Sequence, residues 1–308
     1  MTPLNKLERA ILETLAYSDI FEYPLLIEEV HRYLSIRATL DQTLNGLSRA
    51  KQADSRSGYY FLAGHDIYVD IRTQRAAASI PAFKRAVRYG RILGSMPFVR
   101  MVGMTGSLAV MNLSKGADID YMLVTQPGRL WMARAFAVTF GRMMRPFGHR
   151  ICVNLLVSES ALLWPIHDLY SAREMCQMIP ITGMDVYRRL CTANTWIESI
   201  LPNASLESSG LQLKVHEPAS ALQKLLELPL RGEYSDWLER WCMKSQLHRI
   251  ARRGSSDETN FTVDVCQSNF HSHRKWAHEV FQDKLNRLNL QLEPRRMGER
   301  EERIKESV

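Results

Sequence analysis

Hydrophobic residues near the N-terminus recur at the spacing of one helical face. Positions 4, 7, 11, 12 and 15 are apolar, which predicts an amphipathic helix over residues 4–16. Tyr23 and Pro24 open a second predicted helix that continues to about residue 34, because proline is favoured in the first turn of a helix. A third helix is predicted over residues 39–51, and the aromatic run at 58–64 predicts a short strand after a Ser-Gly turn.

The middle of the chain changes between helical and strand patterns. Residues 66–93 have a mostly helical pattern, and residues 98–105 form an apolar, β-branched run of the kind found in a buried strand that enters a turn. The elements predicted after this strand are a short helix at 108–113, a strand at 117–125, an amphipathic helix at 131–144 and a strand at 150–157. This order of strand, helix and strand indicates a mixed sheet with covering helices.

The last part of the chain has a helical pattern from about residue 168 almost to residue 292, with interruptions at prolines and glycines. Residues 293–308 are rich in Arg and Glu and lack apolar periodicity, which predicts a disordered tail. We therefore expect a mixed α+β chain in four parts. These are an N-terminal module at 1–75, a sheet-containing core at 76–200, a helical C-terminal domain at 201–292 and the charged tail at 293–308.

Charge is unevenly distributed over these parts. The chain of 308 residues has a formal net charge of +7, and the balance is −1 for residues 1–75, +7 for 76–200 and +1 for 201–308. Concentration of positive charge in the core predicts an anionic substrate there. The cations available to it are Arg85, Arg88, Arg91, Arg100, Lys115, Arg129 and Arg134, of which Lys115 is the preferred candidate.

Cysteine usage and hydropathy indicate the cellular compartment that we expect for the protein. The five cysteines are scattered and form no Cys-x-x-Cys pair, which argues against a zinc site or a disulfide framework and favours a reducing cytoplasm. The N-terminus carries Lys6, Glu8 and Arg9 without the apolar core of a signal peptide. No stretch reaches the roughly 18 uninterrupted apolar residues of a spanning helix, so we expect no membrane partner.

The candidate chemistry lies between the two strands of the core. Gly106 and Ser107 form a turn after the first strand, where backbone amides and the serine hydroxyl would face a phosphate. Asp118 and Asp120 lie two positions apart on the next predicted strand, so their side chains share one face. Neighbouring carboxylates repel each other unless a cation lies between them, and hard oxygen ligands favour Mg²⁺. Alternatively, the serine caps a helix and the aspartates are solvated turn residues.

These residues resemble the DNA polymerase β-like nucleotidyltransferase superfamily, whose pattern is a Gly-Ser turn, a spacer of this length and an Asp-x-Asp strand. Residues 128–134, 168–174 and 194–203 also look like a group of predicted bacterial nucleotidyltransferases. The resemblance implies transfer of a nucleoside monophosphate, most plausibly AMP from ATP, to a hydroxyl of a small molecule, RNA or protein acceptor. It further implies that Asp118 and Asp120 bind Mg²⁺ (or Mn²⁺), and that Gly106, Ser107 and Lys115 hold the phosphates.

One position departs from the family pattern. The superfamily usually supplies a third carboxylate from a later strand, but the best candidate strand here carries Asn154. An amide oxygen can bind Mg²⁺, yet it brings no negative charge and cannot act as a general base. Glu159 lies five positions further on, so it would replace the carboxylate only after a bend or at the end of the strand.

Two alternatives stay open. Asn154 favours a catalytically degenerate nucleotide-binding protein that acts as a regulator or scaffold through its N-terminal module. The other alternative is a tRNA-directed nucleotidyltransferase of a toxin pair, which would use the basic core and the basic helix end at 244–253.

The N-terminal module resembles a winged-helix domain, since three helices precede a small β wing. Such domains often bind DNA. Here the module has a net charge of −1, and its candidate recognition helix carries only Arg49 and Lys51 as basic residues. DNA readers need a positive face, so DNA binding is possible but not favoured, and a protein-contact or substrate-positioning role is preferred.

Overall fold

The computed structural model describes residues 5–205, 215, 220–230, 232–252, 258–268 and 272–290. The tail predicted for residues 293–308 lies outside the described residues, as does Arg253 at the end of the basic helix. Among the described helices, none combines the length and the apolar character needed to cross a membrane.

The N-terminal module contains the predicted three helices and a β-hairpin. The hydroxyl of Thr39 accepts a hydrogen bond from the amide of Gln42, and the Gln42 side chain accepts one from the amide of Thr39, which together cap the third helix. The elements are α1 (Lys6–Asp19), α2 (Ile27–Arg32), α3 (Leu40–Arg49), β1 (Ala53–Arg56) and β2 (Tyr59–Leu62), with β1 and β2 antiparallel.

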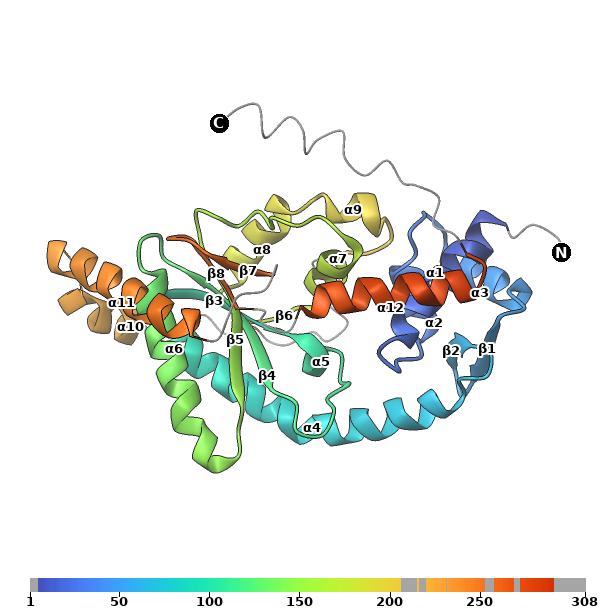
Figure 1. The fold of residues 1–308 in the computed structure, drawn as a ribbon, viewed down its shortest axis with the longest axis horizontal. Coiled ribbons are helices and arrows are strands. Elements are labelled where there is room, and N and C mark those ends of the chain that lie inside the picture. Colours follow the sequence, from blue (N-terminus) through green and yellow to red (C-terminus); the bar gives the residue numbers. More distant parts are fainter. Residues whose placement is uncertain are drawn as a thin grey trace, which may run out of the picture.

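One long helix connects this module to the rest of the protein. Helix α4 (Ile67–Gly94) has 28 residues and continues through Pro81. It confirms the helical pattern of residues 66–93. The expected module boundary after residue 75 falls inside α4, so the two parts are joined without an irregular linker (Figure 1).

A six-stranded mixed sheet forms the centre of the fold, which confirms the α+β class. Its strands lie in the order β6-β3-β4-β5-β8-β7, and only the pair β4 and β5 is parallel. The crossover between these two strands contains α6 (Leu130–Met144) and the short η1 (Arg145–Phe147). The strands are β3 (Val99–Thr105), β4 (Ile119–Thr125), β5 (Ile151–Ser158), β6 (Ile179–Thr182), β7 (Thr259–Phe261) and β8 (Val265–Ser268).

Three strands correct the expectation of continuous helical structure from residue 168 to residue 292. Strand β6 pairs with β3, and the β7–β8 hairpin extends the other side of the sheet through β5. The region expected to be a separate helical domain therefore supplies two strands to the core sheet. The helices that follow β5 are α7 (Leu169–Gln177), α8 (Met184–Ala193), α9 (Ile197–Ile200), α10 (Ser220–Glu227), η2 (Leu228–Leu230), α11 (Glu233–Ala251) and α12 (His273–Arg287).

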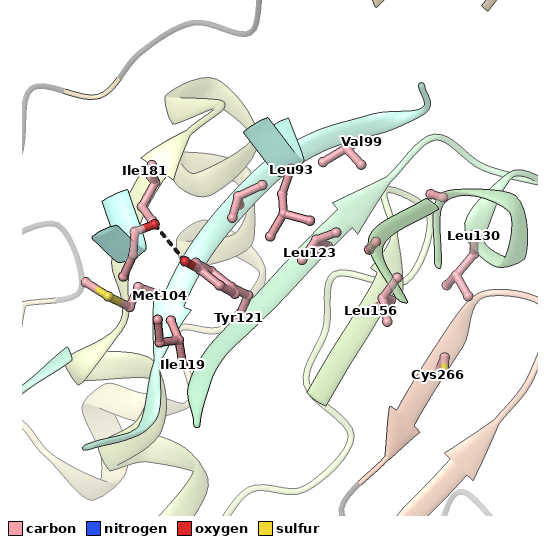
Figure 2. Packing of buried hydrophobic residues seen from close by; sticks show 14 of the residues in the cluster. Leu93, Val99, Met104, Ile119, Tyr121, Leu123, Leu130, Leu156, Ile181 and Cys266 are labelled. Carbon is pink, nitrogen blue, oxygen red and sulfur yellow. Dashed lines mark hydrogen bonds between the residues drawn. The ribbon is translucent and has the colours of Figure 1, made fainter. Parts of the chain in front are cut away.

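The main hydrophobic core lies between the sheet, α4 and α6. Tyr121 is fully buried there, and its hydroxyl donates a hydrogen bond of 2.6 Å to the carbonyl of Ala86 on α4 (Figure 2). Trp131 on α6 is also fully buried, and its indole Nε1 donates to the carbonyl of Thr262 beside β8 at 3.0 Å. Because both polar atoms find partners, these large rings are buried without an unsatisfied donor.

Helix α12 packs against the N-terminal module and also contacts α7 (Figure 1). Phe281 and Leu285 are buried in the same cluster as the core of α1, and the rings of Phe281 and Tyr17 lie 5.3 Å apart, edge to face. Lys284 forms an ion pair with the buried Asp19. Helix α12 and the N-terminal module thus meet, and both line a cavity.

Candidate functional site

A cavity of about 820 Å³ lies where the N-terminal module, the sheet and the C-terminal helices meet. Its walls come from α1, β4, β5, α6, α7, α11 and α12, together with the turn at Gly106 and Ser107, which form the start of the short helix α5 (Gly106–Ala109). Asp118, Asp120 and Asn154 also line it. The fold therefore brings five of the six predicted site residues to one cavity.

Asp118 and Asp120 enter the cavity at the start of β4. Strand β4 begins at Ile119, whose side chain is buried on the opposite face, so Asp118 immediately precedes the strand and Asp120 is its second residue. Both carboxylates reach the cavity, as the alternation predicts. Asp118 is paired with Arg150, whose Nε lies 2.6 Å from Asp118 Oδ1.

A bulge in β5 directs Asn154 toward Asp120. Val153 pairs with Tyr121 and Leu155 pairs with Met122, so Asn154 is the extra residue between two consecutive pairs. Bulges of this kind re-aim a side chain. The Asn154 Nδ2 donates a 2.6 Å hydrogen bond to Asp120 Oδ1, and the thiol of Cys152 donates to Asn154 Oδ1 at 2.8 Å.

Both the backbone conformation and the neighbouring side chain require a glycine at position 106. Its φ of +67° lies in the left-handed region, and a Cβ atom there would be 2.6 Å from Asp120 Oδ2. The glycine thus allows the turn to lie directly against the Asp120 carboxylate. Contrary to the expectation that this first amide faces a phosphate, the Gly106 N–H donates to the carboxylate of Glu174. Ser107 is half-buried and lines the cavity beside it.

Glu174 is a carboxylate of the site that the sequence reasoning missed. It lies on α7, whose first turn is capped by Asp168 Oδ1 accepting from the Ser171 amide at 2.8 Å. Its helix neighbours Arg173 and Met175 are buried, and Glu174 itself reaches the cavity. A single acid among buried positions of an otherwise well-packed helix is the sequence signal that could have identified it.

Burial is the main cause that disfavours ionisation of two acids in the cavity. Burial raises the pKa of Asp120 to about 7, the Asn154 hydrogen bond acts to lower it, and the charges of Glu174 and Asp118 raise it further. Burial also raises the pKa of Glu174 to about 7, against the lowering effect of the Gly106 amide. Two mutually repelling carboxylates in one cavity are a typical arrangement of catalytic or cation-binding sites.

Two other predicted candidates are not brought to the site. Lys115 is exposed and is not among the residues lining the cavity. Glu159 follows the end of β5 beside Thr125, and its carboxylate forms an ion pair with Arg189. Because Thr125 is five residues along β4 from Asp120, Glu159 lies about 16 Å along the strand from the acids. The structure therefore does not support Glu159 as a replacement for the missing carboxylate.

Arginines dominate the remaining charges of the cavity. Of the seven cations expected to be available for phosphates, Arg134 is the one that lines it, while Arg100 and Arg129 form ion pairs with Glu227 and Asp236. Arg134 donates to Gln246 Oε1 at 2.6 Å. The other arginines of the lining are Arg142, Arg145, Arg150, Arg173, Arg249 and Arg274. This lining fits an anionic molecule, as the charge distribution predicted.

The donor atoms of the site are compatible with a hard divalent cation. Asp118, Asp120 and Glu174 supply carboxylate oxygens, which Mg²⁺ prefers, whereas the amide oxygen of Asn154 already accepts from the Cys152 thiol. Within the described part of the chain, no group of three or more His, Cys, Asp or Glu side chains is already clustered for a metal ion. A cation bound by Asp118 would have to displace Arg150 from that carboxylate.

Comparison with known proteins adds no relative. No family model matches the chain, and neither the curated proteins nor the solved structures give a match. The likeness to the polymerase β-like superfamily thus stays a prediction from the Gly106–Ser107 turn and the Asp118–Asp120 pair.

Proposed function

We propose that the protein is a Mg²⁺-dependent nucleotidyltransferase that transfers a nucleoside monophosphate, most plausibly AMP from ATP, to a hydroxyl. The observation that supports this proposal is that Asp118, Asp120 and Glu174 line one arginine-lined cavity, with Asp120 and Glu174 lying against Gly106. The cations of such a cavity suit a reaction in which a polyphosphate is held. Its acids suit the binding of a metal ion and the removal of a proton.

The roles of the residues follow from their positions. Asp118 and Asp120 would hold Mg²⁺, which when bound neutralises phosphate charge and orients the reacting oxygens. Asn154 holds one oxygen of Asp120 and leaves Oδ2 directed toward Gly106. Ser107 and cavity arginines such as Arg142, Arg145 and Arg249 bind the phosphates, whereas Arg150, Arg173 and Arg274 already have partners.

Glu174 acts as the general base, a role that the Asn154 amide cannot take. Its carboxylate has a pKa of about 7, so near neutral pH a substantial fraction is ionised and able to accept a proton. In the proposed step the acceptor oxygen attacks the α-phosphorus, the bond to the pyrophosphate oxygen breaks, and the hydroxyl proton passes to Glu174. Pyrophosphate leaves with the electron pair of the broken bond.

The N-terminal module contributes to substrate positioning in this proposal. Tyr17, Ser18, Phe21 and Tyr23 line the cavity from α1 and the segment after it. Arg173 on α7 fixes the module, since its guanidinium lies 3.9 Å from the centre of the Tyr33 ring and 4.8 Å from that of Tyr17. A module held in this way against the acids is suited to shape the acceptor site.

A calorimetric titration of each nucleoside triphosphate with Mg²⁺ tests the proposal. Wild type should bind one triphosphate selectively, and Asp118→Asn/Asp120→Asn should lose the metal-dependent binding. Asp185→Asn is the matched control, because Asp185 is exposed on α8 away from the cavity and should leave binding unchanged. Absence of binding of all triphosphates to the wild type would reject the proposal.

A second candidate function is nucleotide sensing without turnover. The observation in its favour is that Asp118 is already neutralised by Arg150 and Asp120 already receives the Asn154 amide, so both acids have partners without a cation. Asn154→Asp distinguishes the two. An inactive relic can gain transfer activity from the added carboxylate, whereas an enzyme that uses Glu174 should lose activity because a further charge is placed against Asp120. Glu174→Gln should abolish turnover in the enzyme while retaining triphosphate binding.

A further inference from the structure

Helix α11 has apolar residues on two opposite faces. Cys242, Gln246 and Ile250 are buried on the face that packs against α6, and Gln246 Nε2 donates to the carbonyl of Trp131 at 2.8 Å. Tyr234, Trp237 and Trp241 follow one another at intervals of three and four residues. At about 100° per residue, this second stripe lies on the side of the helix turned away from α6.

The outer stripe is exposed although it consists of the largest side chains. Tyr234 is 65% exposed, Trp237 52% and Trp241 55%, and the rings of Tyr234 and Trp237 are stacked with centroids 5.7 Å apart. Leu225, Leu226 and Leu228 on the adjoining α10 and η2 are also exposed. Helices α10 and α11 are both drawn at the end of the molecule opposite the N-terminal module (Figure 1).

This surface supplies a large part of the apolar area of a protein interface. Each aromatic ring has roughly 150–250 Å² of surface, so the three half-exposed rings present roughly 300 Å² of apolar area. The leucines add to it. A standard interface takes about 800 Å² from each partner, of which somewhat more than half is apolar. Tyr and Trp are also the residues most enriched at the centres of interfaces.

The charges beside the stripe point to a particular partner. Glu233 lies at the N-terminal end of α11 and Lys244 in its C-terminal half, both exposed and on the same side of the helix as the rings. They are 11 residues apart, about 16 Å along the helix axis, so they do not reach each other within one helix. A second α11 in the opposite direction would place each acidic end beside a basic half.

We propose that α11 mediates self-association, pairing antiparallel with α11 of a second copy about a two-fold axis. In this arrangement Trp241 of each copy packs against Trp237 of the other. Tyr234 then lies beside Lys244 of the other copy, which gives a cation–π contact, and Glu233 faces the same lysine. The pattern is self-complementary, as a two-fold interface requires, because each contact occurs twice.

Analytical ultracentrifugation between about 1 and 100 μM tests the inference, and the dimer should have twice the chain mass of 35.5 kDa. Trp237→Ala/Trp241→Ala should weaken self-association at least about 30-fold, the effect of removing an interface hot spot. Phe147→Ala is the matched control, because Phe147 is 70% exposed on η1 and lies outside the stripe. It should leave the dissociation constant unchanged.

Charge exchange tests the direction of the helices. Glu233→Lys and Lys244→Glu should each weaken the dimer about threefold or more, because each creates two like-charge contacts. The double variant should associate more tightly than either single variant, since the opposite charges meet again across the two-fold axis, while the cation–π contact of Lys244 is lost. A wild type that stays monomeric at 100 μM would overturn the inference. Failure of the double variant to associate more tightly would overturn the antiparallel arrangement.

Discussion

Gly106→Ala tests the close approach between the turn and the acid pair. The new methyl group meets two penalties. The left-handed backbone at φ +67° disfavours any residue with a Cβ by about 1–2 kcal/mol. The Cβ would also lie 2.6 Å from Asp120 Oδ2, and overpacking of this kind typically costs about 1–3 kcal/mol. Together they predict a loss of about 2–5 kcal/mol in the free energy of unfolding.

The Asp120 side chain cannot move away from the added methyl group without losing a hydrogen bond. Its other oxygen accepts the 2.6 Å hydrogen bond from Asn154, so rotation of the carboxylate away from residue 106 breaks that bond. A buried donor that loses its acceptor is destabilising by about 1–3 kcal/mol. The alanine variant is therefore expected to displace Asp120 and to lose Mg²⁺-dependent triphosphate binding as well as stability.

Gly116→Ala is the matched control for the backbone effect. Gly116 has φ +79° in the loop before β4, and no atom lies within 4 Å of its added Cβ. It should lose only the about 1–2 kcal/mol of the left-handed conformation. Urea denaturation of both variants gives the comparison. Equal losses of stability in Gly106→Ala and Gly116→Ala, with triphosphate binding intact in the former, would refute the proposed contact with Asp120.

Three further predictions concern charge and packing. Because the pKa of Glu174 is raised to about 7, the folded protein keeps a proton that the unfolded chain releases above about pH 4, so stability should fall between about pH 4 and 7. Glu174→Gln should remove this part of the slope in urea denaturation at a series of pH values, and an unchanged slope would contradict the assignment. Tyr33→Leu should reduce the unfolding free energy by about 2 kcal/mol more than Tyr33→Phe, because the phenylalanine ring retains the cation–π contact with Arg173. Equal losses in urea denaturation would show that this contact does not stabilise the fold. Phe281→Ala should lose about 3–5 kcal/mol and increase hydrogen exchange in α12, whereas His278→Ala on its exposed face should change stability by less than about 0.5 kcal/mol.

Local sequence patterns were sufficient to predict the helices and strands in the first half of the chain. The helical periodicity of residues 66–93 corresponds to α4, and the apolar runs before Gly106 and after Asp118 correspond to β3 and β4. These segments are long, and their periodicity is repeated several times. The core strands were also identifiable because buried strands contain continuous β-branched and apolar residues.

The strands that escaped prediction are short and depend on distant partners. Strands β6, β7 and β8 have only three or four residues each, too few to show a period. Strand β6 even contains Pro180, which disfavours a central strand and is tolerated here at the edge of the sheet. Their pairing partners lie more than 70 residues away in the chain for β6 with β3 and more than 100 for β8 with β5. Such contacts leave no mark on a local window of sequence.

The site shows the same division between local and distant information. Gly106, Asp118 and Asp120 were identifiable because a turn and an alternating strand fix their directions within 15 residues. The direction of Asn154 depends on a bulge, which the apolar pattern of β5 does not reveal. Glu174 is separated from Asp120 by 54 residues, and only the packing of α7 against the turn brings its carboxylate to Gly106.

The position of Glu174 changes how the presence of Asn154 in the site is interpreted. The cavity already contains two acids whose burial raises their pKa values to about 7, and the charge of Glu174 raises the pKa of Asp120 further. A third carboxylate at residue 154 would face Asp120 at hydrogen-bond distance, where Asn154 Nδ2 now donates at 2.6 Å. It would therefore replace a favourable contact by repulsion between like charges in a buried place, and the pair would share a proton. The amide instead favours ionised Asp120, while α7 supplies the additional acid from the other wall. In this arrangement the asparagine supports the acids it lies beside, and its presence does not by itself indicate a degenerate site.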